Sequence, residues 1–286
     1  MSFAIISDTT CDLPQDYISD NQIDIIPLYY SMGNVIYGDE NNMPPEEFYT
    51  RMRGGEMPTT MASNPETTKK IYMKHLENGE DILQISFSSA LSSSYNTYCI
   101  VASELKEEFP ERKIIVIDSL CASMGEGLFI YKAVNLRRQG KTIEETEKWL
   151  LENRLYFCHQ FTVDNLFHLH RGGRVSKATA ILGTMINVKP VLHVDDEGRL
   201  IPLKNVRGRK KSLNSLVDNM AELIGGFEND MVMIGHGDCI DDAVYVKEQI
   251  EKRLGIKNFM INYICPTIGT HSGPDTLALF FMGEKR

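Results

Sequence analysis

The sequence predicts an α/β protein of two domains, and three observations support this prediction. Its 286 residues suggest about two domains at roughly 150 residues each. Short β-rich runs alternate with longer helical patterns as far as about residue 155, which predicts a parallel sheet flanked by helices. Beyond that point strand-like and helical segments no longer alternate regularly, and their order favours an α+β domain with a mixed or antiparallel sheet. We therefore expect an N-terminal domain at 1–155 and a C-terminal domain at 156–286.

The elements of the first half follow from apolar runs and from helical spacing. Runs of four to seven mostly apolar residues predict buried strands, and apolar residues three or four apart predict helices between them. The expected strands are 3–7, 24–30, 81–86 and 113–118, and the expected helices are 65–77, 94–108 and 128–138. Ligands of such sheets bind in loops beyond the carboxyl ends of the strands.

After an expected helix at 141–153, the second half contains strands that can pair in opposite directions. The turn signal Asp195-Asp196-Glu197-Gly198 separates two apolar runs and can close an antiparallel hairpin. The expected strands are 156–163, 188–194, 200–206, 231–235 and 257–264, with helices at 212–223 and 240–254.

Composition and charge argue against several classes of function. The formal net charge of -9 disfavours general attraction to nucleic acid or to an anionic membrane. Apolar runs are far shorter than the roughly 20 residues that cross a bilayer, and the first residues lack the pattern of a secretory signal. Six scattered cysteines form neither a zinc pattern nor a disulfide framework. We expect a cytoplasmic protein with reduced thiols.

Loops rich in hydroxyl groups follow several of the expected strands. They contain Asp8-Thr9-Thr10-Cys11, Thr59-Thr60-Met61-Ala62-Ser63, the serine-rich run 86–95, Asp118-Ser119 with Ser123, and Gly269-Thr270-His271-Ser272-Gly273-Pro274. Hydroxyl and backbone N–H groups at helix starts can bind a carboxylate or phosphate that has left water. Ordinary helix capping explains the same residues, so the loops alone leave an anion pocket and a structural role open.

Histidines and basic clusters are further candidates. His271 stands between two glycines, where its imidazole could donate to an anion or serve the fold alone. His168 and His170 lack an evident third ligand, so we expect no metal site. Two arginines flank the glycines of Arg171-Gly172-Gly173-Arg174, and 207–211 carries four positive charges; such groups suit an acidic ligand or partner, or form a solvated basic surface.

The sequence lacks the usual signatures of a nucleotide site or of a hydrolase. There is no phosphate loop, no dinucleotide-binding glycine pattern, no nucleophile elbow and no H-E-x-x-H motif. Serine-rich loops do not make a hydrolase unless a base and an orienting partner are in reach. These residues therefore predict a pocket without specifying a reaction.

Six segments in order resemble the DegV family of bacterial fatty-acid-binding proteins, from about residue 3 to the C-terminus. They are Asp8-Thr9-Thr10; Thr60 before Asn64-Pro65; Ser88-Ser89-x-Leu91-Ser92-x-x-Tyr95; Asp118-Ser119 with Ser123-Met124-Gly125; Gly172-Gly173-Arg174-Val175-Ser176; and Gly269-Thr270-His271-Ser272-Gly273-Pro274. The resemblance implies two domains that hold one long-chain fatty acid, with its carboxyl group near the domain junction.

The resemblance also implies a lipid-binding role without catalysis. Members studied as fatty acid kinase subunits present the acid to an ATP-using kinase protein, which forms an acyl phosphate for phospholipid synthesis. No cofactor is expected other than the bound fatty acid as ligand, and neither nucleic acid nor integral membrane association is expected.

Site residues carry over from the resemblance position by position. Thr60 and Ser92 resemble the hydroxyls that bind the carboxylate, Ser93 could assist through its amide, and His271 resembles the histidine of the same network. Arg174 and Arg207 resemble basic positions that face the kinase partner. Departures stand at three positions, where many members have serine, glycine and glycine: Met61, Ser93 and Asp275.

Two other hypotheses remain open on the sequence. A phosphotransferase or hydrolase could use His271 beside the hydroxyl loops, by analogy with related substrate domains of dihydroxyacetone kinases. A regulatory lipid sensor would bind the same ligand but act on a different partner.

Overall fold

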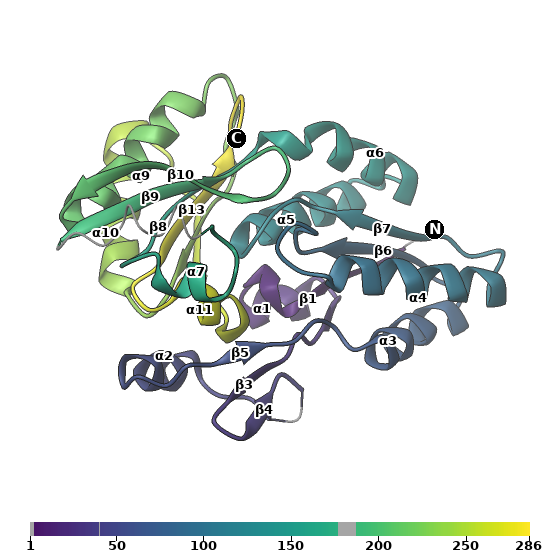
Figure 1. Cartoon of the computed structure of the whole chain (residues 1–286). Coiled ribbons are helices and arrows are strands. Elements are labelled where there is room, and N and C mark those ends of the chain that lie inside the picture. The colour runs from purple at the N-terminus through teal and green to yellow at the C-terminus, as the bar shows by residue number, and fades with distance from the viewer. Residues whose placement is uncertain (1–2, 40, 177–186) are drawn as a thin grey trace.

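The computed structural model describes residues 3–39, 41–176 and 187–286, which form two large sheets, a small one and their helices (Figure 1). The predicted fold class is confirmed: the first large sheet is parallel and the second is mixed. The strand order is β2-β1-β6-β7 in the first sheet and β10-β9-β8-β13-β11-β12 in the second.

The parallel sheet is buried on both faces. Its strands are β1 (Phe3–Asp8), β2 (Ile23–Ile26), β6 (Asp81–Ser86) and β7 (Ile114–Asp118). Alternate residues of β1 point to opposite faces: Ala4 and Ile6 pack with α3 (Pro65–Glu77) and α4 (Ser94–Glu108), whereas Phe3 and Ile5 pack on the other side. That side is covered by α5 (Met124–Arg138) and α6 (Ile143–Asn153) (Figure 1).

The mixed sheet contains one parallel pair, β11 (Val232–His236) with β12 (Phe259–Tyr263), and antiparallel pairs elsewhere. Its other strands are β8 (Phe157–Thr162), β9 (Val188–Val194), β10 (Leu200–Arg207) and β13 (Leu277–Met282). Helices α9 (Arg209–Leu223) and α10 (Ile240–Leu254) bury their apolar sides against its outer face.

Helix α5 is shared by the two large sheets. It contacts β1 and β6 of the parallel sheet as well as β8, β11 and β13 of the mixed sheet. Residues 124–130 of α5 are all buried, so apolar residues occur around the circumference of this part of the helix, and Leu128, Phe129 and Ile130 are consecutive and fully buried. One core therefore runs through the junction of the sheets, and the expected domain boundary near residue 155 remains a prediction.

A small antiparallel sheet lies beside this junction. It contains β3 (Tyr30–Met32), β4 (Val35–Tyr37) and β5 (Thr59–Thr60), and it is accompanied by α2 (Pro45–Arg53) (Figure 1). The remaining short elements are η1 (Thr9–Cys11), α1 (Gln15–Asp20), η2 (Arg154–Tyr156), α7 (Phe167–Arg171) and α11 (Pro266–Ser272).

One predicted strand was wrong in part, and one strand was overlooked. The single strand expected at 24–30 divides, because β2 ends at Ile26 and Tyr30 pairs in the small sheet instead. The sequence analysis also overlooked β13, whose six buried residues occupy an interior position of the mixed sheet. Within the described ranges, no helix is both long and apolar enough to span a membrane.

Candidate functional site

A cavity of about 300 Å³ lies between the mixed sheet and the loops that follow the parallel strands, within the size range of small-molecule sites. The first half of the chain contributes Leu28 and Phe87 to its wall, and the mixed sheet contributes Phe161, Val194 and Phe280. Because more than half of the lining residues are apolar, the cavity suits a ligand with a long hydrocarbon part.

Eight lining residues carry hydroxyl groups, and four of these donate to acceptors of the protein. Thr10 donates to the Asp8 carboxylate and also lies 3.1 Å from Glu126, and Ser123 donates to the Asp12 carboxylate. Thr267 donates to the Leu28 carbonyl, and Thr276 donates to backbone carbonyls of α11 and its C-cap. These protons are not available to a ligand. The other four hydroxyls belong to Thr60, Ser92, Ser93 and Ser272.

Thr60 and His271 are brought together from distant parts of the chain. Thr60 ends β5, which pairs with β3, and His271 stands in the last turn of α11. The Thr60 Oγ1 atom lies 2.8 Å from His271 Nε2. Burial, reinforced by the positive charges of Arg174 and Arg171, lowers the pKa of His271 to about 3, so its ring is neutral at pH 7.

The other ring nitrogen of His271 decides how this hydrogen bond is directed. Nδ1 is buried and has no hydrogen-bond partner among the described residues. An unpartnered N–H in this position costs more than a bare acceptor nitrogen, so we assign the proton to Nε2. His271 then donates to Thr60 Oγ1, and the Thr60 proton is free to bind an acceptor in the cavity.

A similar relay acts on Ser92. The Ser63 amide donates to Ser94 Oγ at 3.2 Å, and Ser94 Oγ lies 2.9 Å from Ser92 Oγ. The Ser94 amide also donates to Ser92 Oγ at 3.2 Å. If the Ser94 hydroxyl donates in the same direction, Ser92 accepts two hydrogen bonds and keeps its own proton for the cavity. Ser94 itself is fully buried and is not part of the cavity wall.

These serines stand at the start of α4, where the helix dipole favours an anion. Ser93 is the exposed N-cap residue and Ser92 is partly buried, so this end of the cavity approaches the surface. Met61 also lines the cavity and is 40% exposed. Its thioether adds apolar contact at a position where a hydroxyl would donate a hydrogen bond.

Arg174 lies at the same end of the cavity and is partly buried. Its guanidinium donates to the Leu91 carbonyl at 3.1 and 2.8 Å and to the Gly172 carbonyl at 2.5 Å. Burial lowers the pKa of Arg174 from its high usual value. A positive charge is therefore held beside the hydroxyls of Ser92 and Thr60.

Five of the six predicted site residues line this cavity: Thr60, Ser92, Ser93, Arg174 and His271. Arg207 does not, because it ends β10 as an exposed residue and pairs with Val188 of β9. No group of three or more His, Cys, Asp or Glu side chains within the described parts of the chain could hold a metal. His168 packs against the C-cap of α11.

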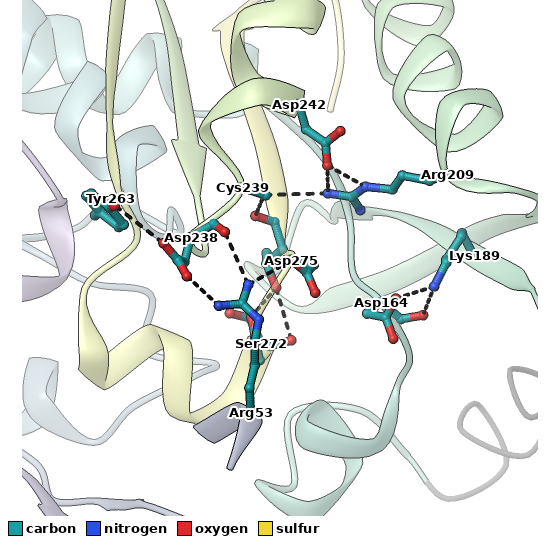
Figure 2. A network of polar contacts seen from close by, with 12 residues as sticks. Arg53, Asp164, Lys189, Arg209, Asp238, Cys239, Asp242, Tyr263, Ser272 and Asp275 are labelled. Atoms are coloured by element: carbon teal, nitrogen blue, oxygen red, sulfur yellow. Dashed lines mark hydrogen bonds and ion pairs between the residues drawn. The ribbon is translucent and has the colours of Figure 1, made fainter. Parts of the chain in front are cut away.

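Asp275, at a position where DegV proteins often have glycine, has a positive φ of 60°. Its carboxylate accepts a hydrogen bond from Arg53 at 2.9 Å, and Arg53 also pairs with Asp238 (Figure 2). Arg53 belongs to α2, so these ion pairs connect that helix to the segment after α11, through Asp275, and to the loop after β11, through Asp238. The carboxylate of Asp275 thus contacts α2, and Asp275 is not among the residues that line the cavity.

The sequence analysis overlooked buried groups that surround the site. Ser94 was one hydroxyl in a serine run, and its relay to Ser92 depends on Ser63 of another segment. His159 also lines the cavity; its Nδ1 donates to the Phe157 carbonyl, its Nε2 accepts from the Ala122 amide, and burial lowers its pKa well below the usual value. The sequence shows His159 only as a histidine within an apolar strand, and this pattern does not predict its place in the cavity wall.

Comparison with known proteins gives a consistent result over the whole chain. The family model described as "Uncharacterised protein, DegV family" matches residues 2–284. A DegV domain-containing protein of Clostridium perfringens is 37% identical over 286 residues, which cover 99% of this chain and 98% of that protein.

Solved structures agree with the sequence match. A DegV lipid-binding protein of Thermotoga maritima has a TM-score of 0.87 and 31% identity, with both chains covered completely. A stearic acid-binding protein of Eubacterium ventriosum has a TM-score of 0.90 and 25% identity, with 99% of this chain and 98% of that chain covered.

Proposed function

This chain belongs to the DegV family, and on that premise we propose that it binds one long-chain fatty acid in the cavity beside its mixed sheet. In this proposal the carboxylate accepts from the hydroxyls of Thr60 and Ser92, with the Ser93 amide assisting. His271 orients the Thr60 hydroxyl, and the alkyl tail lies along the apolar wall of the cavity. The observation that carries this proposal is that the Thr60 hydroxyl, 2.8 Å from His271 Nε2, and the Ser92 hydroxyl, 2.9 Å from Ser94 Oγ, both line one largely apolar cavity.

The energetics of such a ligand suit the two ends of the cavity. Burying about 14 methylenes at about 0.8 kcal/mol each gives on the order of 11 kcal/mol before the costs of association. A carboxylate that leaves water needs donors in place of its hydration, or the cost is several kcal/mol. Thr60 and Ser92 supply hydroxyl donors, and Arg174 supplies a nearby positive charge.

We further propose that the protein is a carrier that presents the acid to a separate ATP-using fatty acid kinase in the cytoplasm. The kinase would form the acyl phosphate for phospholipid synthesis, and the carrier itself would not catalyse the reaction. Arg174 at the cavity end and the exposed Arg207 are the proposed contacts to the kinase. The His271 ring is neutral and its Nδ1 has no partner among the described residues, so no carboxylate in those parts of the chain orients it as the base of a hydrolase.

Ligand binding is tested by native mass spectrometry of the purified protein, before and after incubation with a series of saturated and unsaturated acids of 12 to 18 carbons. We expect a single bound acid, recovered with the protein or taken up on incubation. Absence of any bound acid, together with no uptake, contradicts the proposal.

The carrier role is tested with purified kinase, ATP and loaded protein. Arg207→Ala is expected to slow acyl phosphate formation several-fold and to leave fatty acid affinity unchanged, since Arg207 does not line the cavity. Lys257→Ala, also an exposed cation, is the control. Binding of the acid without any transfer to a kinase would favour a lipid sensor instead.

A further inference from the structure

Helices α7 and α11 pack through two reciprocal contacts between a glycine and a histidine. Gly172 is the C-cap of α7, and a Cβ atom added there would overlap Nδ1 of His271 in α11 and lie 2.8 Å from its Cε1. Gly273 is the C-cap of α11, and a Cβ atom there would lie 2.5 Å from Cδ2 of His168 in α7. Each histidine ring therefore fills the space that a side chain on the opposite C-cap would need.

The two glycines differ in why they are required. Gly273 has a φ of +83°, which disfavours any other residue on backbone grounds alone. Gly172 has φ -77° and ψ -7°, which every residue adopts readily. At Gly172 the requirement comes from the imidazole ring, so this position separates a contact with His271 from backbone strain.

From this contact we infer that Gly172 is a positioning residue for the fatty acid carboxylate, which it does not touch. Its bare Cα lets the His271 ring lie close against α7, with Nε2 directed at Thr60 Oγ1 at 2.8 Å. The inference rests on the proposed function, because the head-group network matters only if a carboxylate binds there.

Neighbouring contacts hold α7 in place. A methyl group added at Gly172 is therefore expected to displace the His271 ring and not the helix. Arg171 donates to the Pro58 carbonyl at 2.9 Å and to the Thr270 carbonyl at 3.1 Å. Arg174 donates to the Gly172 carbonyl itself. A methyl group at Gly172 would therefore displace the imidazole and break its hydrogen bond to Thr60, which leaves the Thr60 hydroxyl without its fixed direction.

The experiment compares Gly172→Ala with Gly226→Ala, whose added methyl meets no atom within 4 Å. We expect Gly172→Ala to weaken fatty acid binding at least 10-fold and Gly226→Ala to leave it within twofold. The NMR signals of the His271 ring nitrogens, recorded without ligand, should show loss of the Nε2 hydrogen bond in Gly172→Ala. Unchanged signals and unchanged affinity overturn the inference.

The double variant Gly172→Ala with His271→Ala keeps the test decisive if the single variant folds poorly. Removal of the ring removes the overlap, so the double variant should match His271→Ala alone in thermal stability and in affinity. Further loss in the double variant would mean that the methyl collides elsewhere. If the wild type binds no fatty acid, the proposed function fails, but the ring signals still decide whether Gly172 positions His271.

Discussion

The Thr60 hydroxyl oxygen lies 2.8 Å from Nε2 of His271, although 211 positions separate the two residues in the chain. Thr60 comes from the small sheet and His271 from a short helix before the last strand, so the folded chain alone creates the pair. The pair fixes the direction in which the threonine proton points, and the following predictions depend on this.

Replacement of the Thr60 hydroxyl by a methyl group should weaken fatty acid binding. Thr60→Val keeps the shape of the side chain and removes the donor, so we expect a loss of about 1–3 kcal/mol, or roughly 5- to 150-fold in the dissociation constant. Titration with a fluorescent fatty acid measures this change in the dissociation constant. Thr59→Val is the control, because Thr59 is exposed and its hydroxyl lies 2.8 Å from that of Ser31. Equal affinities for both variants contradict a role for Thr60.

Ser94→Ala should weaken binding although Ser94 does not line the cavity. Loss of its hydroxyl leaves Ser92 without one partner and frees the Ser92 proton to rotate, so we expect a roughly 3- to 10-fold effect. The same loss should be much smaller in a Ser92→Ala background, which a double-mutant cycle measures. The exposed Ser89→Ala serves as control. Full additivity of the two changes would show that Ser94 acts independently of Ser92.

His271 should contribute no pH dependence to fatty acid affinity between pH 6 and pH 8. The pKa of His271 is lowered to about 3, first by burial and then by Arg174 and Arg171, so the ring does not gain a proton in this range. A titrating histidine would instead strengthen carboxylate binding as the pH falls. Affinities of the wild type and His271→Asn, measured at intervals of half a pH unit, should run parallel. A rise toward pH 6 that His271→Asn abolishes would disprove the neutral assignment.

Asp12→Asn should stabilise the protein at pH 8. The Asp12 carboxylate accepts from Ser123 and from the Cys265 amide, yet burial outweighs these bonds and raises its pKa to about 7. Because the folded state then binds more protons than the unfolded state between about pH 4 and pH 7, the free energy of unfolding falls as pH rises through that window. A shift of about 3 units corresponds to about 4 kcal/mol.

Asparagine can accept from the Cys265 amide through Oδ1 and donate through Nδ2 to Ser123 Oγ without ionising, and it tolerates the positive φ of 54° at this position. Urea unfolding at pH 5, 6, 7 and 8 should therefore show a shallower decline for Asp12→Asn than for the wild type. Asp20→Asn, on the surface, is the comparison variant. Identical slopes for all three proteins would remove Asp12 as the source of the pH dependence.

The sequence predicted the parts of the fold whose signals are local. Apolar runs such as 81–86 and helical spacing at 65–77 match β6 and α3, because buried strands and amphipathic helices are encoded within one segment. The strand expected at 24–30 was wrong beyond Ile26, since pairing partners from other segments decide where one sheet ends and another begins. Strand β13 was overlooked as a short apolar run near the C-terminus.

The sequence predicted which residues form the site, and the structure shows which of them share a cavity and which lie within hydrogen-bond distance of one another. Thr60, Ser92, Ser93, Arg174 and His271 line one cavity, which the resemblance implied and spacing alone did not. The direction of each proton depends on groups that carry no sequence signal, such as the unpartnered Nδ1 of His271 and the Ser63 amide. The space that Gly172 leaves for an imidazole likewise exists in the packed molecule alone.

The cavity walls come from the mixed sheet and from loops that follow strands of the parallel sheet, so an occupant of the cavity would contact both halves of the fold. A bound acyl chain would fill this cavity in the core. Because the acid binds only the folded protein, each tenfold increase of its concentration above the dissociation constant would add about 1.4 kcal/mol to the unfolding free energy. Release of the acid would return the protein to the lower unfolding free energy of its ligand-free form. Thermal stability and rapid release of the fatty acid would then place opposite demands on this cavity. Selection for one property would limit the other.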